Sequence, residues 1–323
     1  MDILVIGVSN VFLRRVLPAL LASPAVGRIH LASRRAGVEV SIPTDRLGHV
    51  YEGYQAALDA LEPCLAYISL PNHLHGTWAR ASLSAGFHVI VDKPVVLDLA
   101  EAEALVELAS RQGRCLAEAT VWAFHPQIEI VKQVFAGTPG GVRSVQSVFS
   151  FPPPAPSNFR NDPKMGGGSF NDLCAYAISP GRTFFGAIPD EVWCRVLSFD
   201  AVSGIDTAFS LTAVYPEGCV LQGYFGFGTE YRNTMVMLGA DACVELDPAF
   251  TSQRDAEHAI SVWRQGVSEV RAVAAGDSFR LFFERVIDSI QRGDWAEWPE
   301  ALLQDAVIAD LAAQSAGIKR NAN

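Results

Sequence analysis

Residues 2–22 read DILVIGVSNVFLRRVLPALLA: a short apolar run, a glycine, and then a helical pattern. A strand, a tight turn and a helix in this order are typical of a dinucleotide-binding unit, whose turn has the fingerprint G-x-G-x-x-G. Gly7 occupies the first glycine position, whereas Ser9 and Phe12 stand at the second and third. By itself, this motif is equally compatible with an ordinary turn that binds no nucleotide.

The residues around Gly7 are still able to bind a phosphate. Gly7 permits the tight turn, and the hydroxyl of Ser9 can donate to a phosphate oxygen at the positive end of the following helix. We therefore predict a phosphate-binding turn formed by Gly7, Ser9 and Asn10. Phe12 excludes the usual close packing of helix on strand, so we expect the helix over 11–22 to be displaced from the first strand.

The first third of the chain alternates short apolar runs with amphipathic segments, which predicts a parallel sheet covered by helices on both faces. The expected strands cover residues 2–6, 28–32, 64–70, 88–91 and 114–117, and the expected helices cover 11–22, 54–61, 74–85 and 99–112.

The remainder of the chain has a different pattern, in which β-type runs follow one another and predict an antiparallel sheet. These runs cover 142–150, 191–198, 207–215, 219–227, 234–238 and 243–246, with helices over 171–185, 278–292 and 300–317. The proline- and glycine-rich stretch from Phe151 is expected to be a long loop. The sequence thus predicts an α/β Rossmann domain over 1–120, followed over 121–323 by an α+β domain with a large open, mainly antiparallel sheet. The closing helices could pack back on the first domain.

The composition limits the partners that this chain can have. The formal net charge is -10 and 50% of the residues are hydrophobic, which favours a soluble globular protein and argues against nucleic acid or an anionic membrane as a partner. No apolar run approaches the roughly 20 residues that span a bilayer, and no basic leader is present, so we expect a cytoplasmic protein. The six scattered cysteines are expected to be reduced and buried. No compact ligand set predicts a metal site.

A second cofactor contact is predicted at the end of the second expected strand. Ser33, Arg34 and Arg35 stand where an NAD enzyme has an acid that binds the ribose 2′-hydroxyl. Because guanidinium groups suit bidentate contacts with phosphate, these residues favour the 2′-phosphate of NADP(H), with NAD(H) as the weaker choice. A solvated surface pair is the alternative.

Residues 68–109 read ISLPNHLHGTWARASLSAGFHVIVDKPVVLDLAEAEALVELA. This segment resembles the Gfo/Idh/MocA family of NAD(P)-dependent oxidoreductases. The family's Pro-Asn-His turn is present as Pro71-Asn72-His73, and its Glu-Lys-Pro as Asp92-Lys93-Pro94, with aspartate in place of glutamate. The resemblance continues through EATVWAFHPQ (118–127), SNFRNDP (157–163) and GGGSFNDLCAYAISPGRTFFG (166–186), and so covers nearly the whole chain.

Family resemblance implies a Rossmann domain, a C-terminal domain whose open sheet often mediates dimerisation, and an active site in the cleft between them. A homo-oligomer, dimer or tetramer, is the expected assembly. Lys93 corresponds to the family's signature catalytic residue, which contacts the substrate hydroxyl or carbonyl. Phe159 and Arg160 resemble an aromatic-arginine pair that reaches over the nicotinamide. The positions implied to contact the cofactor are Leu70, Pro71, Asn72, His75, Asp92, Lys93 and Arg160.

Reduction of a ketone needs a hydride, a proton donor within hydrogen-bond reach, and a cation near the developing alkoxide. Lys93 suits the role of the cation, because it follows a parallel strand at the edge where ligands bind. Asp172 and Tyr176 are four residues apart, so on a helix they share a face. The family commonly has Asp and His at this spacing, whereas some sugar ketoreductases have tyrosine. We predict Tyr176 as the proton donor and Asp172 as the group that orients Lys93 or the sugar hydroxyls. The alternative is that Tyr176 is a core residue and that a histidine donates the proton.

The family acts mostly on carbohydrates and polyols. Tyrosine at the position of the acid and the segment GYFGFGTEYRN (223–233) favour a keto-sugar, free or nucleotide-linked, as the substrate. Trp122 and Tyr231 are predicted to border its pocket. Two alternatives remain: an NADP-dependent aldose or trans-dihydrodiol dehydrogenase, and a dinucleotide-sensing regulatory protein without turnover. A sensing protein has no need of a complete proton path. The presence of Lys93, Asp172 and Tyr176 together therefore disfavours that alternative.

Overall fold

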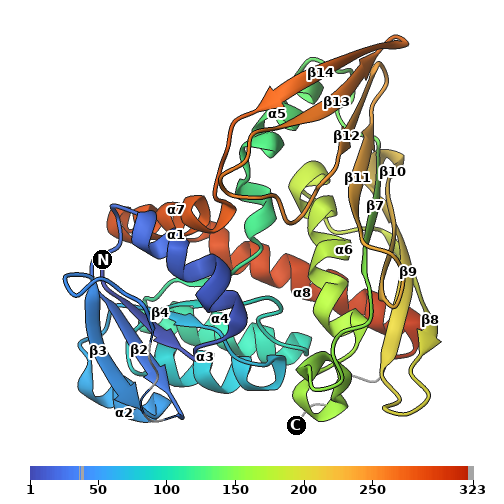
Figure 1. The fold of residues 1–323 in the computed structure, drawn as a ribbon. Helices are drawn as coiled ribbons and strands as arrows, with labels where there is room; N and C mark the ends of the chain where they lie inside the picture. Colours follow the sequence, from blue (N-terminus) through green and yellow to red (C-terminus); the bar gives the residue numbers. More distant parts are fainter. Residues whose placement is uncertain (36, 38–39, 319–323) are drawn as a thin grey trace. The chain divides into compact units, whose positions relative to one another are not determined.

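The computed structural model describes residues 1–35, 37 and 40–318 of the 323-residue chain. Contacts divide the chain into two compact units (Figure 1). The first comprises Met1–Ala119 and Phe279–Leu303, and the second comprises Thr120–Ser278 and Gln304–Asn323. The first unit is therefore assembled from two separate stretches of sequence.

A six-stranded parallel sheet forms the centre of the first unit, in the order β3-β2-β1-β4-β5-β6. Its strands are β1 (Ile3–Ile6), β2 (Ile29–Ser33), β3 (Leu47–Glu52), β4 (Leu65–Ile68), β5 (His88–Val91) and β6 (Leu116–Glu118). This is the strand order of a Rossmann fold, and the predicted α/β class is confirmed. The order reverses between β1 and β4, where such sheets bind ligands beyond the carboxyl ends of their strands.

Helices cover both faces of this sheet. All four residues of β1 and of β4 are buried, and successive side chains of a strand point to opposite faces. Among the covering helices is α7, whose Phe283 ring lies 5.4 Å from the Tyr67 ring of β4. The helices of this unit are α1 (Leu17–Ala22), α2 (Tyr54–Ala60), α3 (His75–Ser84), α4 (Leu99–Gln112), α7 (Ser278–Arg292) and the first part of α8 (Glu297–Ala316).

The first helix begins with a π-helical turn, Phe12–Val16, that runs directly into α1. The Phe12 side chain, which replaces the third glycine of the fingerprint, is fully buried. A π turn is wider than an α turn and is found mostly as a single turn within a helix. The Phe12 ring is thus packed in the core within an irregular first turn, and the displacement of the helix from β1 stays a prediction.

The second unit contains an eight-stranded sheet in the order β14-β13-β12-β11-β7-β10-β9-β8. Its strands are β7 (Ser144–Phe151), β8 (Glu191–Phe199), β9 (Asp206–Tyr215), β10 (Cys219–Phe227), β11 (Arg232–Leu238), β12 (Ala242–Leu246), β13 (His258–Arg264) and β14 (Val267–Val273). All neighbouring strands are antiparallel except β7 and β10, which run parallel. The prediction of a mainly antiparallel sheet is confirmed, although β13 and β14 were not predicted.

One face of this sheet packs on α6 (Ser169–Phe185), which contacts β7, β9 and β10, while α5 (Pro126–Ala136) contacts β12 and β14. Short 3-10 turns at Phe159–Asn161 and Pro163–Met165 lie in the stretch predicted as a long loop. Exposed apolar side chains remain on β8, where Trp193 is 53% and Phe199 is 65% exposed. The sheet is thus open on one side, as predicted.

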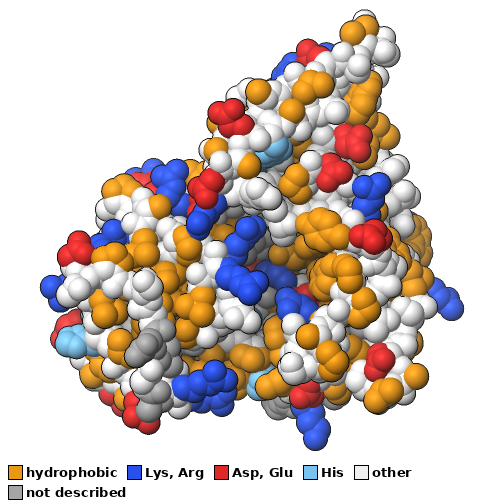
Figure 2. Space-filling model, viewed as in Figure 1, with side chains coloured by type: hydrophobic (Ala, Val, Ile, Leu, Met, Phe, Trp, Pro, Cys, Tyr) orange, Lys and Arg blue, Asp and Glu red, His pale blue; other side chains and the backbone are white. Residues whose placement is uncertain are grey.

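All six cysteines are free thiols, of which four are buried and Cys64 and Cys243 are half-buried. Within the part of the chain that the structure describes, no helix is long and apolar enough to cross a membrane. On the face shown in Figure 2, acidic, basic and hydrophobic side chains are interspersed over much of the surface.

Candidate functional site

The turn after β1 requires glycine at its first position. Gly7 has a φ of +94°, and a Cβ atom placed on it would lie 2.5 Å from the carbonyl oxygen of Ser69, beyond the end of β4. The Gly7 amide donates to the Ala32 carbonyl of β2 over 3.0 Å. The turn is therefore fixed between its two neighbouring strands, at the point where the strand order reverses.

Ser9 has a structural role in this turn. Its hydroxyl oxygen accepts the amide of Phe12 at 3.0 Å, and lies 2.7 Å from the hydroxyl oxygen of Ser69. Ser9 thus caps the helix start and links the ends of β1 and β4. Asn10 is exposed at the beginning of the helix. The predicted contact of Ser9 with a phosphate is not tested by this arrangement.

The end of β2 carries the two arginines that the sequence associated with a 2′-phosphate. Ser33 is buried, and its hydroxyl accepts the amide of Arg35 at 3.0 Å. Arg34 and Arg35 are both exposed. Because β2 pairs with β1 up to Ile6 and Ala32, the arginines follow at the same edge of the sheet as the Gly7 turn. The turn at Gly7 and two exposed guanidinium groups thus lie at one edge of the sheet, an arrangement that fits a phosphorylated dinucleotide.

The end of β4 continues through Leu70 and Pro71 into a short 3-10 turn that starts at Asn72, which is 6% exposed. His75 begins α3 and is 1% exposed. Its Nε2 lies 2.7 Å from the Leu70 carbonyl oxygen and its Nδ1 lies 2.6 Å from the Pro94 carbonyl oxygen. Both ring nitrogens therefore face the protein backbone.

The end of β5 carries the predicted catalytic lysine. Lys93 is half-buried, its amide donates to Oδ1 of Asp92 over 3.1 Å, and the Lys93–Pro94 peptide bond is cis. Burial raises the pKa of the Asp92 carboxyl, although the charges of Lys93 and His75 act in the opposite direction. Burial likewise raises the pKa of Tyr67, which neighbours Asp92.

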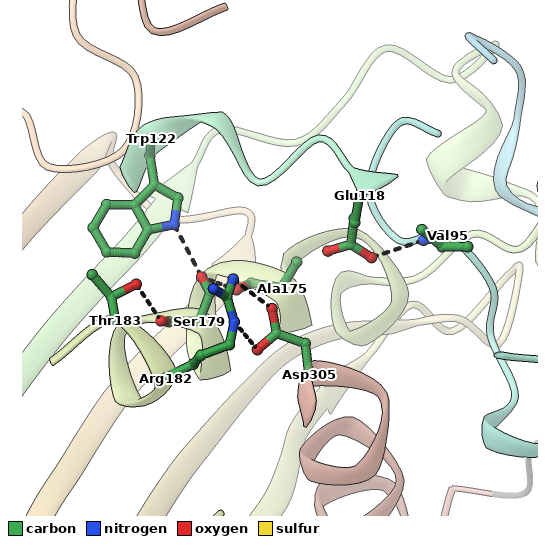
Figure 3. A network of polar contacts seen from close by, with 8 residues as sticks. All are labelled: Val95, Glu118, Trp122, Ala175, Ser179, Arg182, Thr183 and Asp305. Atoms are coloured by element: carbon green, nitrogen blue, oxygen red, sulfur yellow. Dashed lines mark hydrogen bonds and ion pairs between the residues drawn. The ribbon is translucent and has the colours of Figure 1, made fainter. Parts of the chain in front are cut away.

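Glu118, at the end of β6, fixes the segment that follows the lysine. Its Oε2 accepts the amide of Val95 at 2.9 Å, as Figure 3 shows. No role was predicted for Glu118, although it opens one of the segments that carry the family resemblance. The side chains that lie along this edge thus come from the ends of β1, β2, β4, β5 and β6.

In the second unit, α6 holds the other predicted catalytic residues, and a distant strand fixes its beginning. The carboxylate of Asp206 accepts the hydroxyl of Ser169 and the amide of Phe170, both at 2.6 Å. A Cβ on Gly168, whose φ is +104°, would lie 2.3 Å from Oδ1 of Asp206. The glycine before the helix therefore makes room for the carboxylate that caps it. No sequence signal pointed to Asp206.

Asp172 and Arg160 form a bidentate ion pair. Nε of Arg160 donates to Oδ2 of Asp172 over 2.7 Å, and Nη2 donates to Oδ1 over 3.1 Å. The guanidinium carbon lies 5.0 Å from the centre of the Phe159 ring. Asp172 is 4% exposed. Asp172, predicted to orient the substrate, is thus paired with Arg160, which was predicted to contact the cofactor.

Tyr176 lies one turn after Asp172 on α6 and is half-buried. Its ring packs edge-to-face on Phe149, with the centroids 4.8 Å apart, and lies 5.1 Å from Phe250. The body of the ring is therefore anchored in the apolar core, as both of its predicted roles allow.

The two remaining substrate candidates differ in exposure. Trp122 is 1% exposed, and its indole N–H donates to the hydroxyl of Ser179 over 3.0 Å (Figure 3). Trp122 is part of the apolar core of the second unit, and its place at the border of a substrate pocket stays a prediction. Tyr231 is 48% exposed, and its hydroxyl lies 3.0 Å from that of Thr251.

His125 is the N-cap residue of α5, which begins at Pro126. Nδ1 of His125 accepts the amide of Gln127 at 3.3 Å. Burial lowers the pKa of His125 to about 4, with His258 as a smaller cause. Among the described residues, no group of three or more His, Cys, Asp or Glu side chains could hold a metal ion.

Comparison with known proteins assigns both parts of the chain. Residues 1–120 match the model of an oxidoreductase family with an NAD-binding Rossmann fold, and residues 128–245 match the Gfo/Idh/MocA C-terminal domain. An uncharacterised oxidoreductase from Rhizobium meliloti is 32% identical over 297 residues, which cover 90% of this chain and 88% of that protein. The D-xylose 1-dehydrogenase (NADP(+)) 2 of Haloferax volcanii is 30% identical over 298 residues, which cover 90% and 89%.

The chain is also similar to a solved structure along its whole length. The 3-ketoreductase from Actinomadura kijaniata, in complex with NADP and TDP-benzene, matches with a TM-score of 0.90 at 28% identity, over 98% of each chain. The dTDP-3,4-didehydro-2,6-dideoxy-alpha-D-glucose 3-reductase of Actinomadura kijaniata is 28% identical over 308 residues, which cover 95% of this chain and 92% of that protein.

Proposed function

The chain belongs to the Gfo/Idh/MocA family of oxidoreductases, and from this membership we propose that it reduces a keto-sugar, free or nucleotide-linked, with NADPH. The observation that carries the proposal is the similarity, over 98% of the chain, to a 3-ketoreductase in complex with NADP. The two exposed arginines at the end of β2 support the choice of NADP(H) over NAD(H).

The proposed chemistry is divided among four side chains. When bound, NADPH supplies a hydride to the carbonyl carbon. The ammonium of Lys93 stabilises the negative charge that develops on the carbonyl oxygen. The hydroxyl of Tyr176 donates the proton to that oxygen. Asp172 accepts hydrogen bonds from the sugar hydroxyls, and Arg160 holds its carboxylate in one orientation.

The remaining predicted contacts are part of the same proposal. Gly7, Ser9 and Asn10 surround the phosphates, and Arg34 and Arg35 bind the 2′-phosphate. Tyr231, which is half exposed, contacts the substrate. The position of these residues supports the proposal, because Gly7 and Ser9 follow β1 and the two arginines follow β2, at the edge where a Rossmann sheet binds its ligand.

The reaction is tested by following the absorbance of NADPH with a panel of keto-sugars and dTDP-linked keto-sugars. We expect turnover with at least one member, and a loss of about 100-fold or more in kcat for Lys93→Ala and for Tyr176→Phe. Arg111→Ala, in an exposed pair with Glu107 on α4, is the matched control. Turnover that neither active-site variant changes would contradict the proposed roles.

Cofactor preference is tested separately by titrating the protein with NADPH and with NADH. Arg34→Ala should weaken the binding of NADPH much more than that of NADH, because only NADPH has the 2′-phosphate. Equal losses with both cofactors would remove the assignment of Arg34.

A second candidate function is oxidation of an aldose by NADP⁺, with the same residues working in the reverse direction. It is favoured by the 30% identity with a D-xylose 1-dehydrogenase (NADP(+)). Assays of NADP⁺ reduction with aldoses, and with a trans-dihydrodiol, distinguish this activity from keto-sugar reduction.

We also propose that the chain forms a homo-oligomer through the open face of the second sheet. Trp193, Leu197 and Phe199 of β8 are 53%, 49% and 65% exposed, and such apolar groups are typical of interaction surfaces. Light scattering after size exclusion tests this proposal, because Leu197→Glu should shift the assembly toward monomer. An unchanged mass would exclude this surface.

A further inference from the structure

One peptide group beside Lys93 is held at both of its polar atoms. The carbonyl oxygen of Pro94 lies 2.6 Å from Nδ1 of His75. The amide of Val95, in the same peptide group, donates to Oε2 of Glu118 over 2.9 Å (Figure 3). On the other side of Lys93, its own amide donates to Oδ1 of Asp92. The backbone of Lys93 is therefore fixed both before and after the residue.

The contacts of His75 determine how many protons its ring carries. Its two ring nitrogens lie 2.7 Å from the Leu70 oxygen and 2.6 Å from the Pro94 oxygen. A carbonyl oxygen only accepts hydrogen bonds, and a neutral imidazole has a single N–H to donate. A neutral ring would thus direct a nitrogen lone pair at a carbonyl oxygen within hydrogen-bond distance, in a site where the side chain is 1% exposed. Both contacts are favourable only with an imidazolium.

The charged groups around His75 are of both signs. Asp92 and Lys93 lie at the end of β5, and the charge of His75 acts on the Asp92 carboxyl. From α4, the carboxylate of Glu101 lies against Gly76, the neighbour of His75, and itself interacts with Arg80 and Asp98. Two carboxyl groups, Asp92 and Glu101, and two cations, Lys93 and Arg80, therefore lie on the elements packed around the ring.

We infer that His75 is held as an imidazolium that ties the end of β4 to the end of β5, and that His75 and Glu118 are positioning residues for Lys93. This inference rests on the proposed function in so far as Lys93 is catalytic. It differs from the contact with the cofactor that the family resemblance implied for His75, because both ring nitrogens are engaged with backbone oxygens. One of the two carbonyls belongs to Leu70 and the other to Pro94. A single side chain therefore holds both the Pro71-Asn72 turn and the Lys93-Pro94 turn.

The protonation state is tested by NMR on the full chain labelled with ¹⁵N-histidine, near neutral pH and without cofactor. His75→Gln identifies the resonances of His75. We expect two protonated ring nitrogens in slow exchange with water. A ring with one N–H and one bare nitrogen would overturn the inference, and this result does not depend on any enzymatic activity.

The contact with Glu118 is tested by amide hydrogen exchange at Val95. Glu118→Ala removes the acceptor and should accelerate exchange at Val95, whereas Glu118→Gln retains an amide oxygen and should keep it slow. Glu107→Ala, on the exposed side of α4, is the matched control. Fast exchange already in the unchanged protein, or equal exchange in all variants, would contradict the role of Glu118.

Kinetics then separate positioning from the proposed catalysis. If the lysine is displaced, Glu118→Ala and His75→Gln should lower kcat by roughly 10- to 100-fold with little change in the KM for NADPH, and Glu118→Gln should recover most of the rate. His49→Gln, an exposed histidine of the same unit, should have no effect. Full activity in Lys93→Ala would refute the proposed function alone. Full activity in Glu118→Ala and His75→Gln, with Lys93→Ala inactive, would refute the positioning role alone.

Discussion

At the scale of single residues, Gly7 and Gly53 separate two reasons for which a position requires glycine. Both have a φ of +94°, but a Cβ on Gly7 would lie 2.5 Å from the Ser69 oxygen, whereas nothing lies within 4 Å of a Cβ on Gly53. Backbone strain alone therefore acts at Gly53, and strain together with a steric clash acts at Gly7.

We expect Gly53→Ala to reduce the free energy of unfolding by about 1–3 kcal/mol, the usual cost of such a backbone conformation in a residue other than glycine. Gly7→Ala should cost more, because the rigid backbone of the β4 end must move, and it should also weaken the binding of NADPH. Urea unfolding of the two variants measures the difference. Equal losses would mean that the clash is relieved at no cost.

The pair formed by Arg160 and Asp172 is a second prediction at this scale. Arg160→Ala leaves the carboxylate of Asp172, which is 4% exposed, without its bidentate partner, and breaking such a buried pair typically costs about 3–5 kcal/mol. The exposed pair of Arg111 and Glu107 provides the control, since Arg111→Ala should change stability by no more than about 0.5 kcal/mol. A similar change in both variants, measured by urea unfolding, would contradict the assignment.

Sequence reasoning found most candidate residues but not their connections. The glycine turn and the two arginines follow from the fingerprint and its spacing. The link between Arg160 and Asp172 could not be predicted, because a proline- and glycine-rich loop of irregular path separates them. Asp206 lies 20 residues after Gly186, the end of the preceding motif, and only the folded sheet brings its carboxylate to the start of α6.

At the scale of elements, the start of α5 depends on the charge of one histidine. Nδ1 of His125 must be bare to accept the Gln127 amide, and burial lowers the pKa of this ring to about 4. In the unfolded chain the pKa of histidine is about 6.5. Between these two values the unfolded state binds more protons, so the free energy of unfolding falls as the pH is lowered from about 6.5 towards 4.

His125→Asn should retain the cap, because asparagine accepts the same amide hydrogen bond at a helix start, and it should remove the titration. We therefore expect a smaller loss of stability in acid for this variant than for the unchanged protein. Urea unfolding at a series of pH values provides the measurement. The same pH dependence in both proteins would exclude His125 as a contributor.

Elements that form the core were predicted better than those at the edges. The buried strands β4 and β5 are short apolar runs, whereas β3 and β14 carry mostly half-buried or exposed side chains and lie at the edges of their sheets. Their composition gives no clear alternation, so sequence periodicity missed them. The parallel pairing of β7 with β10 was also beyond prediction, because strand direction depends on the partner and not on the pattern within a strand.

At the scale of the whole molecule, the first unit is incomplete without residues from near the end of the chain. Phe282, Phe283, Val286 and Ile287 of α7 are all fully buried, and they belong to the unit that contains the Rossmann sheet. We predict that a fragment of residues 1–119 lacks cooperative unfolding in urea, because the apolar surface beneath α7 is exposed to water.

Co-expression of residues 278–303 as a separate peptide should restore cooperative unfolding and the binding of NADPH to this fragment. A peptide with Phe282→Asp and Phe283→Asp is the matched control and should not restore either property. If the fragment 1–119 unfolds cooperatively by itself, α7 contributes little to the unit, in contradiction to its burial.

The late position of α7 also has a consequence for synthesis of the chain on the ribosome. The strands of the first sheet emerge early, yet Ser278 follows Ala119 by a long interval that contains almost the entire second unit. At translation rates of about 5–20 residues per second, the nascent sheet waits on the order of ten seconds for the helix that covers it. During that interval its apolar face stays exposed to water, and such transiently exposed surface is prone to aggregation. The second unit completes most of its own sheet before the first can close.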